Sequence, residues 1–349
     1  MLDSAEELLL ADVASMYYEQ DLTQEEIAKR IGISRSGVSR LLTRSRELGL
    51  VQIQIRHPLQ TSAALQQELM RRFGLRDAQV LVAGAPGENP LPRLGMLAAR
   101  FLDRALDDGM TVGISWGTSM LQMINAVHPA RRMRLDVVQL MGSISATSPD
   151  VDGPEIARRL ANAYGARCFY LHAPFLVKSA AVREALQQER NMRETFEMMA
   201  RMDVALVGVG AVRASASGLF RAGYLNEAEL ASIREQGAIG DVCGRYFDIH
   251  GAICELELHE RIIGAQPETI RRVPLSVGVA GGVSKSEALL GAMRAGLVSV
   301  VITDEECAKD LLKRAENEPS SMLAAPPVER STTSERAASS VGMHPEPAG

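Results

Sequence analysis

Two glycine-containing turns carry side chains suited to holding an anion. The first lies in the stretch GISWGTSM, where an apolar run breaks at Gly117 and the hydroxyls of Thr118 and Ser119 begin a helical pattern. Glycine lets a ligand approach the backbone closely, and free N–H groups at a helix N-terminus attract phosphate. Ser119 and Gln122 also have the spacing of a capping box. The stretch therefore predicts an anion cradle.

The second turn lies in the stretch SVGVAGGVSKSEALL. Gly281 and Gly282 follow another apolar run, and Ser284 with Glu287 repeats the capping-box spacing. Lys285 would then lie in the first helical turn, where a cation opposes the helix dipole by about 0.3–1 kcal/mol unless an anion binds there. The alternative is that Ser284 only caps the helix and Lys285 points to water. Because the chain carries two such turns, we favour the ligand-binding interpretation.

A third candidate is Asp241, in the stretch GAIGDVCGRYFD. A carboxylate after a glycine in a turn can accept hydrogen bonds from sugar hydroxyls, but it can equally hold the loop through an Asx-turn. Spacing alone favours neither interpretation. The segment VGVG at 207–210 is a weak signal without a full dinucleotide or P-loop fingerprint, so no nucleotide cofactor is expected.

The histidines and cysteines predict neither a metal site nor a catalytic cluster. Four histidines lack ligand spacing and are interpreted as ordinary polar or surface residues: His128, His172, His250 and His259. The four cysteines have no C-x-x-C pairing and are expected to be free, buried thiols: Cys168, Cys243, Cys254 and Cys307. We therefore expect no metal and no cofactor.

The stretch LTQEEIAKRIGISRSGVSRLL predicts two helices joined by a tight turn. Thr23 and Glu26 have capping-box spacing, Gly32 suits a left-handed helix end, and Ser34 can cap the next helix. Residues 29–56 include seven basic residues and one acid, although the whole chain has a net charge of −5. A basic outer face on such a helix pair is typical of DNA-binding proteins.

The second helix of this pair, expected at 34–48, is the one that would enter the major groove. Side chains in its first two turns are assigned to base edges: Arg35, Ser36, Ser39 and Arg40. Gln24 and Arg44 are better placed for phosphate contacts. The alternative is an amphipathic hairpin with a solvated basic face, but caps, turn and charge together favour DNA binding. One module reads one half-site, so we expect at least a dimer.

The rest of the pattern supplies the elements that would position these residues. A first helix is expected at 5–20, and its inner face carries apolar side chains at helical spacing: Leu9, Val13, Met16 and Tyr17. A short strand is expected at 51–56, and a helix at 62–73 would connect the modules or pair with a second subunit. Strand-like runs then alternate with helical ones, at 79–82, 111–115, 135–140, 167–171, 204–209, 275–279 and 298–303. Such alternation predicts a largely parallel sheet with both faces covered.

Length and composition divide the chain into three parts. A length of 349 residues allows two domains, which we place at 1–58 for DNA binding and 59–317 for the ligand and oligomerisation. The tail at 318–349 is rich in Pro, Ser and Ala and is expected to be disordered. No apolar run approaches the roughly 18 residues that span a bilayer, and the N-terminus is acidic rather than signal-like. A cytoplasmic protein with no membrane partner is expected.

Taken together, these motifs resemble the SorC-type, sugar-responsive bacterial transcriptional regulators. The resemblance runs from about residue 5 to 312 and includes the stretches MDVALVGVG and ITDEECA. It implies an N-terminal helix-turn-helix domain and a C-terminal Rossmann-like α/β effector domain related to phosphosugar isomerases and deaminases. It also implies homodimers or homotetramers on double-stranded operator DNA, with a small phosphorylated sugar as effector. Gly117, Thr118, Ser119 and Lys285 match the family's phosphate-holding segments, and Asp241 matches its acidic residue near the sugar.

Two other functions remain as alternatives. The chain could be a phosphosugar isomerase or deaminase with a DNA-binding appendage, but that chemistry needs a general base beside the sugar. Only Asp241 and His250 are candidates for such a role, so no catalytic residue is assigned. The chain could also be a regulator that senses a non-sugar anion, because a cradle of N–H groups and hydroxyls recognises charge more than identity.

Overall fold

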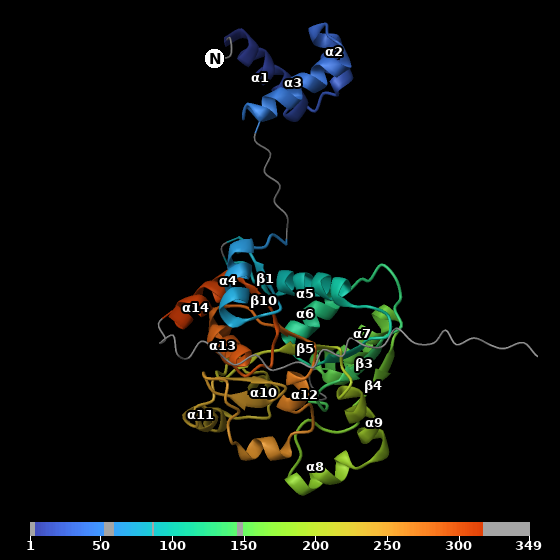
Figure 1. The fold of residues 1–349 in the computed structure, drawn as a ribbon, viewed down its shortest axis with the longest axis vertical. Coiled ribbons are helices and arrows are strands. Elements are labelled where there is room, and N and C mark those ends of the chain that lie inside the picture. Colours follow the sequence, from blue (N-terminus) through green and yellow to red (C-terminus); the bar gives the residue numbers. More distant parts are fainter. Residues whose placement is uncertain (1–3, 52–58, 86, 145–148, 317–349) are drawn as a thin grey trace, which may run out of the picture. The chain divides into compact units, whose positions relative to one another are not determined.

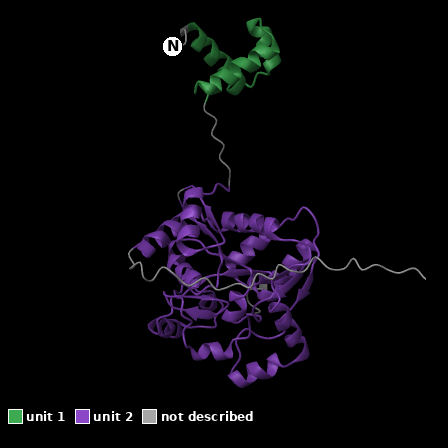
Figure 2. Ribbon diagram, viewed as in Figure 1, with its two compact units in different colours: residues 1–58 green, residues 59–349 purple. Residues whose placement is uncertain are grey.

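The computed structural model describes residues 4–51, 59–85, 87–144 and 149–316. The chain divides into two compact units, Met1–Pro58 (unit 1) and Leu59–Gly349 (unit 2), which are coloured separately in Figure 2. The strand expected at 51–56 falls, apart from Val51, outside the described residues, and so does the tail at 318–349. Each unit is described by itself.

The described part of unit 1 is helical and contains α1 (Ser4–Tyr18), α2 (Gln24–Ile31) and α3 (Arg35–Glu47) (Figure 1). The predicted capping box is formed, because the Thr23 hydroxyl accepts from the Glu26 N–H at 3.3 Å and the Glu26 carboxylate accepts from the Thr23 N–H at 2.9 Å. α2 ends at Gly32, whose φ of 71° is left-handed. Ser34 caps α3 by accepting from the Gly37 N–H at 3.1 Å. The local sequence thus sets both helix boundaries as predicted.

The core of unit 1 brings together Val13 of α1, Ile27 of α2 and Val38 of α3. The prediction that Leu9 lies on the inner face of α1 is wrong, because Leu9 is 42% exposed whereas Leu10 is fully buried. The apolar run at 8–10 offers adjacent leucines, so helical periodicity alone does not decide which of them faces the core.

Unit 2 is built on a parallel sheet whose strand order is β1 (Asp77–Leu81), β10 (Val300–Asp304), β9 (Leu275–Val279), β5 (Val204–Gly208), β2 (Thr111–Ile114), β3 (Asp136–Gln139) and β4 (Arg167–Phe169). Every neighbouring pair in this sheet is parallel. These are the seven strands predicted from the sequence, with ends that differ by at most two residues. The predicted Rossmann-like α/β fold is confirmed.

Helices cover both faces of this sheet (Figure 1). One hydrophobic cluster joins the sheet to α5 (Leu91–Ala105), α6 (Thr118–Ala126) and α7 (Gly153–Tyr164). The other cluster joins it to α4 (Ala63–Phe73), α9 (Arg190–Met199), α12 (Pro267–Arg271), α13 (Ser286–Arg294) and α14 (Glu305–Glu316). Side chains alternate along each strand, so Val301 packs into one cluster and its neighbour Ile302 into the other. α4, which the sequence left as a connector or subunit contact, buries Leu69 within unit 2.

The remaining elements lie between the main strands: the α-helices α8 (Ala180–Gln187), α10 (Gly218–Arg221) and α11 (Glu227–Glu235), the strands β6 (Gly210–Ala211), β7 (Gly240–Val242) and β8 (Arg245–Phe247), and the 3₁₀ turns η1 (Pro149–Val151), η2 (Glu257–Arg261) and η3 (Val283–Lys285). β6, β7 and β8 form a second, antiparallel sheet. Asp241, in the stretch GAIGDVCGRYFD, was predicted to lie in a turn, and that prediction is wrong. The stretch forms the β7–β8 hairpin, with Asp241 on a strand.

The strand order fixes where a ligand can enter unit 2. From β2 the chain continues to β3 and β4 on one side and later returns to β5, β9 and β10 on the other. At such a reversal, the connections leave neighbouring strands in opposite directions and open a crevice at their carboxyl ends, where ligands bind in open α/β sheets. The carboxyl ends of β2, β5 and β9 are the places where the sequence has its glycine-containing turns.

Candidate functional site

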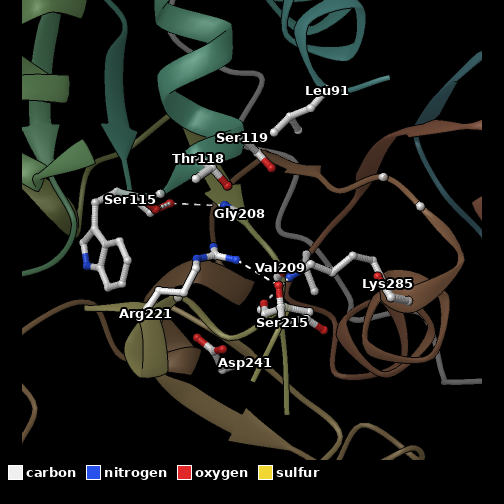
Figure 3. Close-up of a pocket in the computed structure, with 18 of the residues that line it drawn as sticks. Leu91, Ser115, Thr118, Ser119, Gly208, Val209, Ser215, Arg221, Asp241 and Lys285 are labelled. Atoms are coloured by element: carbon white, nitrogen blue, oxygen red, sulfur yellow. Dashed lines mark hydrogen bonds between the residues drawn. The ribbon is translucent and has the colours of Figure 1, made fainter. Parts of the chain in front are cut away.

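A cavity of about 360 Å³ lies at this reversal in strand order. It is lined by residues that follow β2, β5 and β9 and by the first residues of α5, α6 and α10. All seven residues predicted to bind a ligand line it: Gly117, Thr118, Ser119, Asp241, Gly281, Gly282 and Lys285. Segments from Asn89 to Lys285, far apart in the sequence, thus share one cavity (Figure 3).

The first wall is the turn from β2 to α6. The Ser115 hydroxyl accepts from the Gly208 N–H at 3.1 Å and so joins the ends of β2 and β5. Gly117 has a φ of 127°, which an L side chain rarely adopts, and it precedes α6 without a side-chain cap. The predicted capping box of Ser119 and Gln122 is therefore wrong, because the helix already begins at Thr118. N–H groups at an uncapped helix start are available to an anion.

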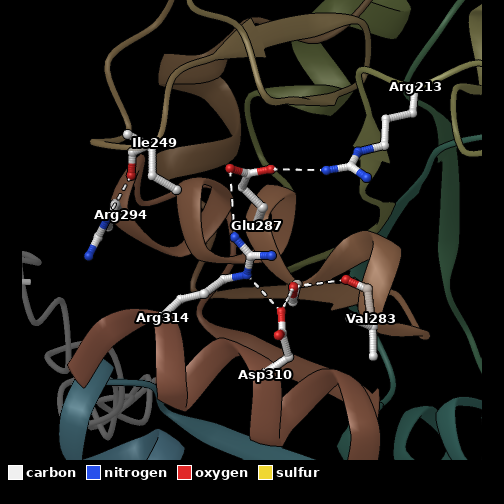
Figure 4. Close-up of polar contacts among 8 residues, drawn as sticks. Arg213, Ile249, Val283, Glu287, Arg294, Asp310 and Arg314 are labelled. Atoms are coloured by element: carbon white, nitrogen blue, oxygen red, sulfur yellow. Dashed lines mark hydrogen bonds and ion pairs between the residues drawn. The ribbon is translucent and has the colours of Figure 1, made fainter. Parts of the chain in front are cut away.

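The second wall is the turn from β9 to α13. Gly282 has a φ of 84°, the 3₁₀ turn η3 follows it, and α13 begins only at Ser286. The predicted capping box of Ser284 and Glu287 is also wrong. The Glu287 carboxylate instead pairs with Arg213 at 3.7 Å and Arg314 at 3.8 Å, as Figure 4 shows. The Glu287 side chain, which the local pattern assigned to a helix cap, thus forms tertiary ion pairs instead.

Lys285 does not point to water. Its Nζ donates to the carbonyl oxygens of Val209 at 2.9 Å and Ala216 at 2.7 Å, and so joins two residues of the β5–α10 connection that line the cavity. Burial lowers the pKa of this amine from its ordinary value to about 8, although the Asp241 carboxylate acts in the opposite direction. Two donors of the ammonium group are engaged by the protein, which leaves a third for a ligand.

Asp241 faces the same cavity from the β7–β8 hairpin. Burial raises the pKa of its carboxyl group, while the Gly244 N–H, donating at 3.0 Å, and the charge of Lys285 lower it. The loop-holding hydrogen bond that the sequence left as an alternative is therefore present. It uses Oδ2, and Oδ1 lies so close to Gly210 that a Cβ there would come within 1.9 Å of it. Asp241 is held in place by the fold.

Arg221 is a cavity residue that the sequence analysis missed. It ends the short helix α10, and Figure 3 shows its side chain between Thr118 and Asp241. Its Nη1 donates to the Ser215 carbonyl oxygen at 3.1 Å. With Lys285 and Asp241 it completes the charged residues of the lining, which therefore carries one net positive charge when all three are ionised. No local spacing marked Arg221, because tertiary packing alone brings α10 to the cavity.

Asp241 and His250, the two candidate acid–base groups, do not lie together. His250 is exposed, its backbone N–H donates to the Asp248 carboxylate, and its side chain is not part of the cavity lining. His259 is buried elsewhere and accepts from the Tyr246 N–H through Nε2 at 2.9 Å. Burial lowers the pKa of His259 to about 4, which is consistent with a neutral structural histidine.

The described part of the chain contains no metal-ligand cluster, no disulfide and no helix suited to spanning a membrane. The residues described there contain no cluster of three or more His, Cys, Asp or Glu side chains that could hold a metal ion. All four cysteines are free; Cys243 and Cys307 are buried as expected, whereas Cys168 and Cys254 are only half-buried. Within the same ranges, no helix combines the length and apolar character needed to cross a bilayer.

All the predicted DNA-contacting side chains except Gln24 lie along α3 of unit 1. The base-edge candidates are exposed: Arg35, Ser36, Ser39 and Arg40. Arg44 is also exposed but pairs with Glu6 at 3.2 Å, so a DNA phosphate would compete with that carboxylate. Gln24 is half-buried at the first position of α2. The exposed face of α3 is thus polar and basic, opposite the buried Val38 and Leu42.

Comparison with known proteins covers both units. Residues 57–313 match the protein family described as "Putative sugar-binding domain", and residues 11–47 match the family of sigma-70 region 4. The chain is 34% identical over 312 residues to the deoxyribonucleoside regulator of Bacillus subtilis strain 168, covering 89% of this chain and 99% of that protein. It is 32% identical over 319 residues to the transcriptional regulator LsrR of Enterobacter sp. strain 638, covering 89% and 94% of the two chains.

A solved structure is similar over both units. The crystal structure of the full-length sorbitol operon regulator SorC from Klebsiella pneumoniae matches with a TM-score of 0.68 and 28% sequence identity. The match covers 89% of this chain and all of that one.

Proposed function

The chain belongs to the SorC family of sugar-binding transcriptional regulators, and from this premise we propose that a phosphorylated sugar in the unit 2 cavity controls operator binding by unit 1. The chain is a DNA-binding regulator rather than an enzyme, as its named relatives are regulators. The proposed effector is a small sugar phosphate. The proposed acting form is a cytoplasmic homodimer or homotetramer on double-stranded operator DNA, with 1–58 as DNA-binding domain and 59–317 as effector domain.

One observation carries the proposal for the effector: the glycine turns at Gly117 and Gly282, the cations Arg221 and Lys285, and the carboxylate of Asp241 line a single cavity. A phosphate monoester is a dianion that binds well to backbone N–H groups and to arginine. We assign the phosphate to the segments of Gly117, Thr118, Ser119, Gly281 and Gly282. Arg221 would supply charge to it from the opposite wall.

The remaining polar groups suit the sugar. A carboxylate accepts hydrogen bonds from hydroxyls, and Asp241 is held facing the cavity by the Gly244 N–H. The free donor of Lys285 can reach the effector while its other two donors hold the carbonyls of Val209 and Ala216. We therefore assign Asp241 to sugar hydroxyls and Lys285 to the junction of sugar and phosphate.

For the DNA-binding face, the proposal follows the helix-turn-helix geometry of unit 1. The first turns of a recognition helix reach base edges, so these contacts are assigned to the exposed residues Arg35, Ser36, Ser39 and Arg40. Phosphate contacts are assigned to Gln24 and Arg44. Since each module reads one half-site, two copies of the chain would bind one operator.

The experiment is a thermal-shift screen on the full chain with pentose 5-phosphates and hexose 6-phosphates, each beside its unphosphorylated sugar. A ligand at a hundred times its Kd stabilises the folded state by about 2.7 kcal/mol, so a shift of several degrees is expected for a matching sugar phosphate. Arg221→Gln should remove the phosphate-dependent part of the shift. Arg213→Gln is the matched control, because Arg213 pairs with Glu287 and does not line the cavity.

Stabilisation by the unphosphorylated sugar alone would contradict the phosphate assignment. A non-sugar anion is the second candidate, because the glycine turns and cations recognise charge whatever carries it. Including small dicarboxylates and nucleoside monophosphates in the screen distinguishes the two effector classes.

A further inference from the structure

We propose that Asp304 and Glu305, at the turn from β10 to α14, couple the effector cavity to the segment through which unit 2 joins the DNA-binding unit. This inference rests on the proposed function. The segment in question, here named the lead-in segment, is Leu59–Ser62, which directly follows unit 1 in the sequence.

On the cavity side, Asp304 holds the second glycine turn. Its Oδ2 accepts from the Gly282 N–H, and its Oδ1 accepts from the Cys307 N–H at 2.9 Å in the first turn of α14. Asp304 is only 5% exposed. A Cβ on Gly281 would come within 2.5 Å of the same carboxylate. The backbone of Gly281 and Gly282 therefore packs against the Asp304 carboxylate, so a shift of one requires a shift of the other.

On the other side, Glu305 holds the chain just after β1, which ends at Leu81. Its Oε2 accepts from the Ala83 N–H at 3.1 Å, and its Oε1 accepts from Lys309 Nζ at 2.6 Å. Ala83 follows Val82, whose N–H donates to the Gln60 carbonyl oxygen at 2.8 Å. The Ser62 N–H donates to the Val80 carbonyl oxygen at 2.9 Å. The lead-in segment thus forms backbone hydrogen bonds with Val80 and Val82, next to Ala83, which Glu305 holds.

The connection from cavity to lead-in segment needs only three hydrogen bonds: Gly282 to Asp304, Ala83 to Glu305, and Val82 to Gln60. Each has a backbone group on at least one side, and the covalent Asp304–Glu305 link joins the first two. Packed elements of this kind shift between discrete arrangements instead of deforming continuously. An effector that prefers one position of Gly282 would therefore bias the position of the lead-in segment.

A second connection exists through α13 and α14 but is less suited to this role. Ser286 donates to Asp310, which Arg314 also contacts at 2.7 Å, and Arg314 reaches Glu287 (Figure 4). Its continuation to α4 is the ion pair of Arg72 and Glu316, 3.8 Å long, and the Glu316 side chain is 67% exposed. A long ion pair with an exposed partner contributes little free energy. The Ala83–Glu305 hydrogen bond also lies at the surface, but it is shorter, at 3.1 Å, and it holds a backbone N–H.

The test compares operator affinity with and without effector in variants of the full chain. The DNA is a duplex selected by the wild-type chain from a random-sequence pool. The effector is the sugar phosphate that gives the largest thermal shift in the screen. Coupling factors between two sites are typically about 5–150-fold, and this ratio of operator affinities is the readout.

In Glu305→Ala we expect the effector Kd and the effector-free operator Kd to stay within about threefold of wild type, while the coupling factor falls at least about fivefold, toward one. Glu305→Gln keeps an oxygen that can accept from Ala83 and should retain coupling. Lys309→Ala, which removes only the other partner of Glu305, and Glu306→Ala, at the exposed neighbouring position, are the matched controls and should behave as wild type.

A wild-type coupling factor in Glu305→Ala overturns the inference and leaves the proposed function standing. An equal loss in Lys309→Ala also overturns it, because the effect would then not depend on Ala83. If wild type binds no sugar phosphate, the proposed function fails and the inference fails with it.

Discussion

Raising the pH above 8 should weaken effector binding through Lys285. Burial lowers the pKa of its amine to about 8, with Arg221 lowering it further and Asp241 opposing the shift. A phosphate dianion in the same cavity favours the charged amine, so binding raises this pKa and takes up a proton. The favourable charge is fully present below about pH 8 and is lost as the pH rises through that value.

The magnitude follows from the linkage between protonation and binding. Each pH unit above the pKa of the free chain costs up to tenfold in affinity, or about 1.4 kcal/mol, until the pKa of the complex is reached. The loss between pH 8 and 10 is therefore up to about 50-fold, because half of the amines are already uncharged at a pH equal to the pKa. Between pH 7 and 8 the affinity should change little, because the second ionisation of a phosphate monoester lies near pH 6.

Calorimetric titration measures this prediction directly. Titrating the full chain with the selected sugar phosphate at pH 7, 8, 9 and 10, in pairs of buffers with different ionisation enthalpies, gives the number of protons taken up. We expect a value near zero at pH 7 that rises toward one proton at pH 9. Lys285→Gln keeps donors for the Val209 and Ala216 carbonyls but has no titrating charge, so it should bind more weakly and without this pH dependence. An equal slope in wild type and Lys285→Gln would refute the reasoning.

Three further predictions test the two units separately. Arg40→Ala should weaken operator binding by about 1–3 kcal/mol in a fluorescence anisotropy titration and leave the effector Kd within a few-fold; equal losses of both affinities would indicate misfolding instead. Thr23→Ala removes a cap that bonds the Glu26 N–H and should cost α2 about 1 kcal/mol. The backbone amides of α2 should then exchange hydrogen about fivefold faster in this variant than in the wild-type chain. An unchanged exchange rate would contradict the capping argument. Gly95→Ala puts a Cβ within 2.5 Å of the Gln122 backbone where α5 crosses α6, so the free energy of unfolding measured with urea should fall by about 1–3 kcal/mol; no loss would mean that these helices separate easily.

Short sequence patterns predicted the helix and strand ends that are set by residues close in the sequence. The Glu26 carboxylate bonds back to the Thr23 N–H and hydroxyl and so completes the capping box. The Glu287 carboxylate instead pairs with Arg213 and Arg314. Strand positions in the main sheet were predicted to within two residues. The signal is clearest for β2, β5, β9 and β10, because buried parallel strands are mostly apolar runs. The β7–β8 hairpin was missed because each of its strands has only three residues and both contain polar side chains.

The sequence by itself determined the helix pair with its basic face, the alternation that makes a parallel sheet, and the glycine turns at the strand ends. Each of these depends on spacing within about a dozen residues. Only the tertiary structure decided that the turns at Gly117 and Gly282 line one cavity, that Arg221 joins them, and that the Lys285 amine is buried against two carbonyls. The physical reason is that strand order, not distance along the chain, determines which carboxyl ends meet at the reversal of the sheet.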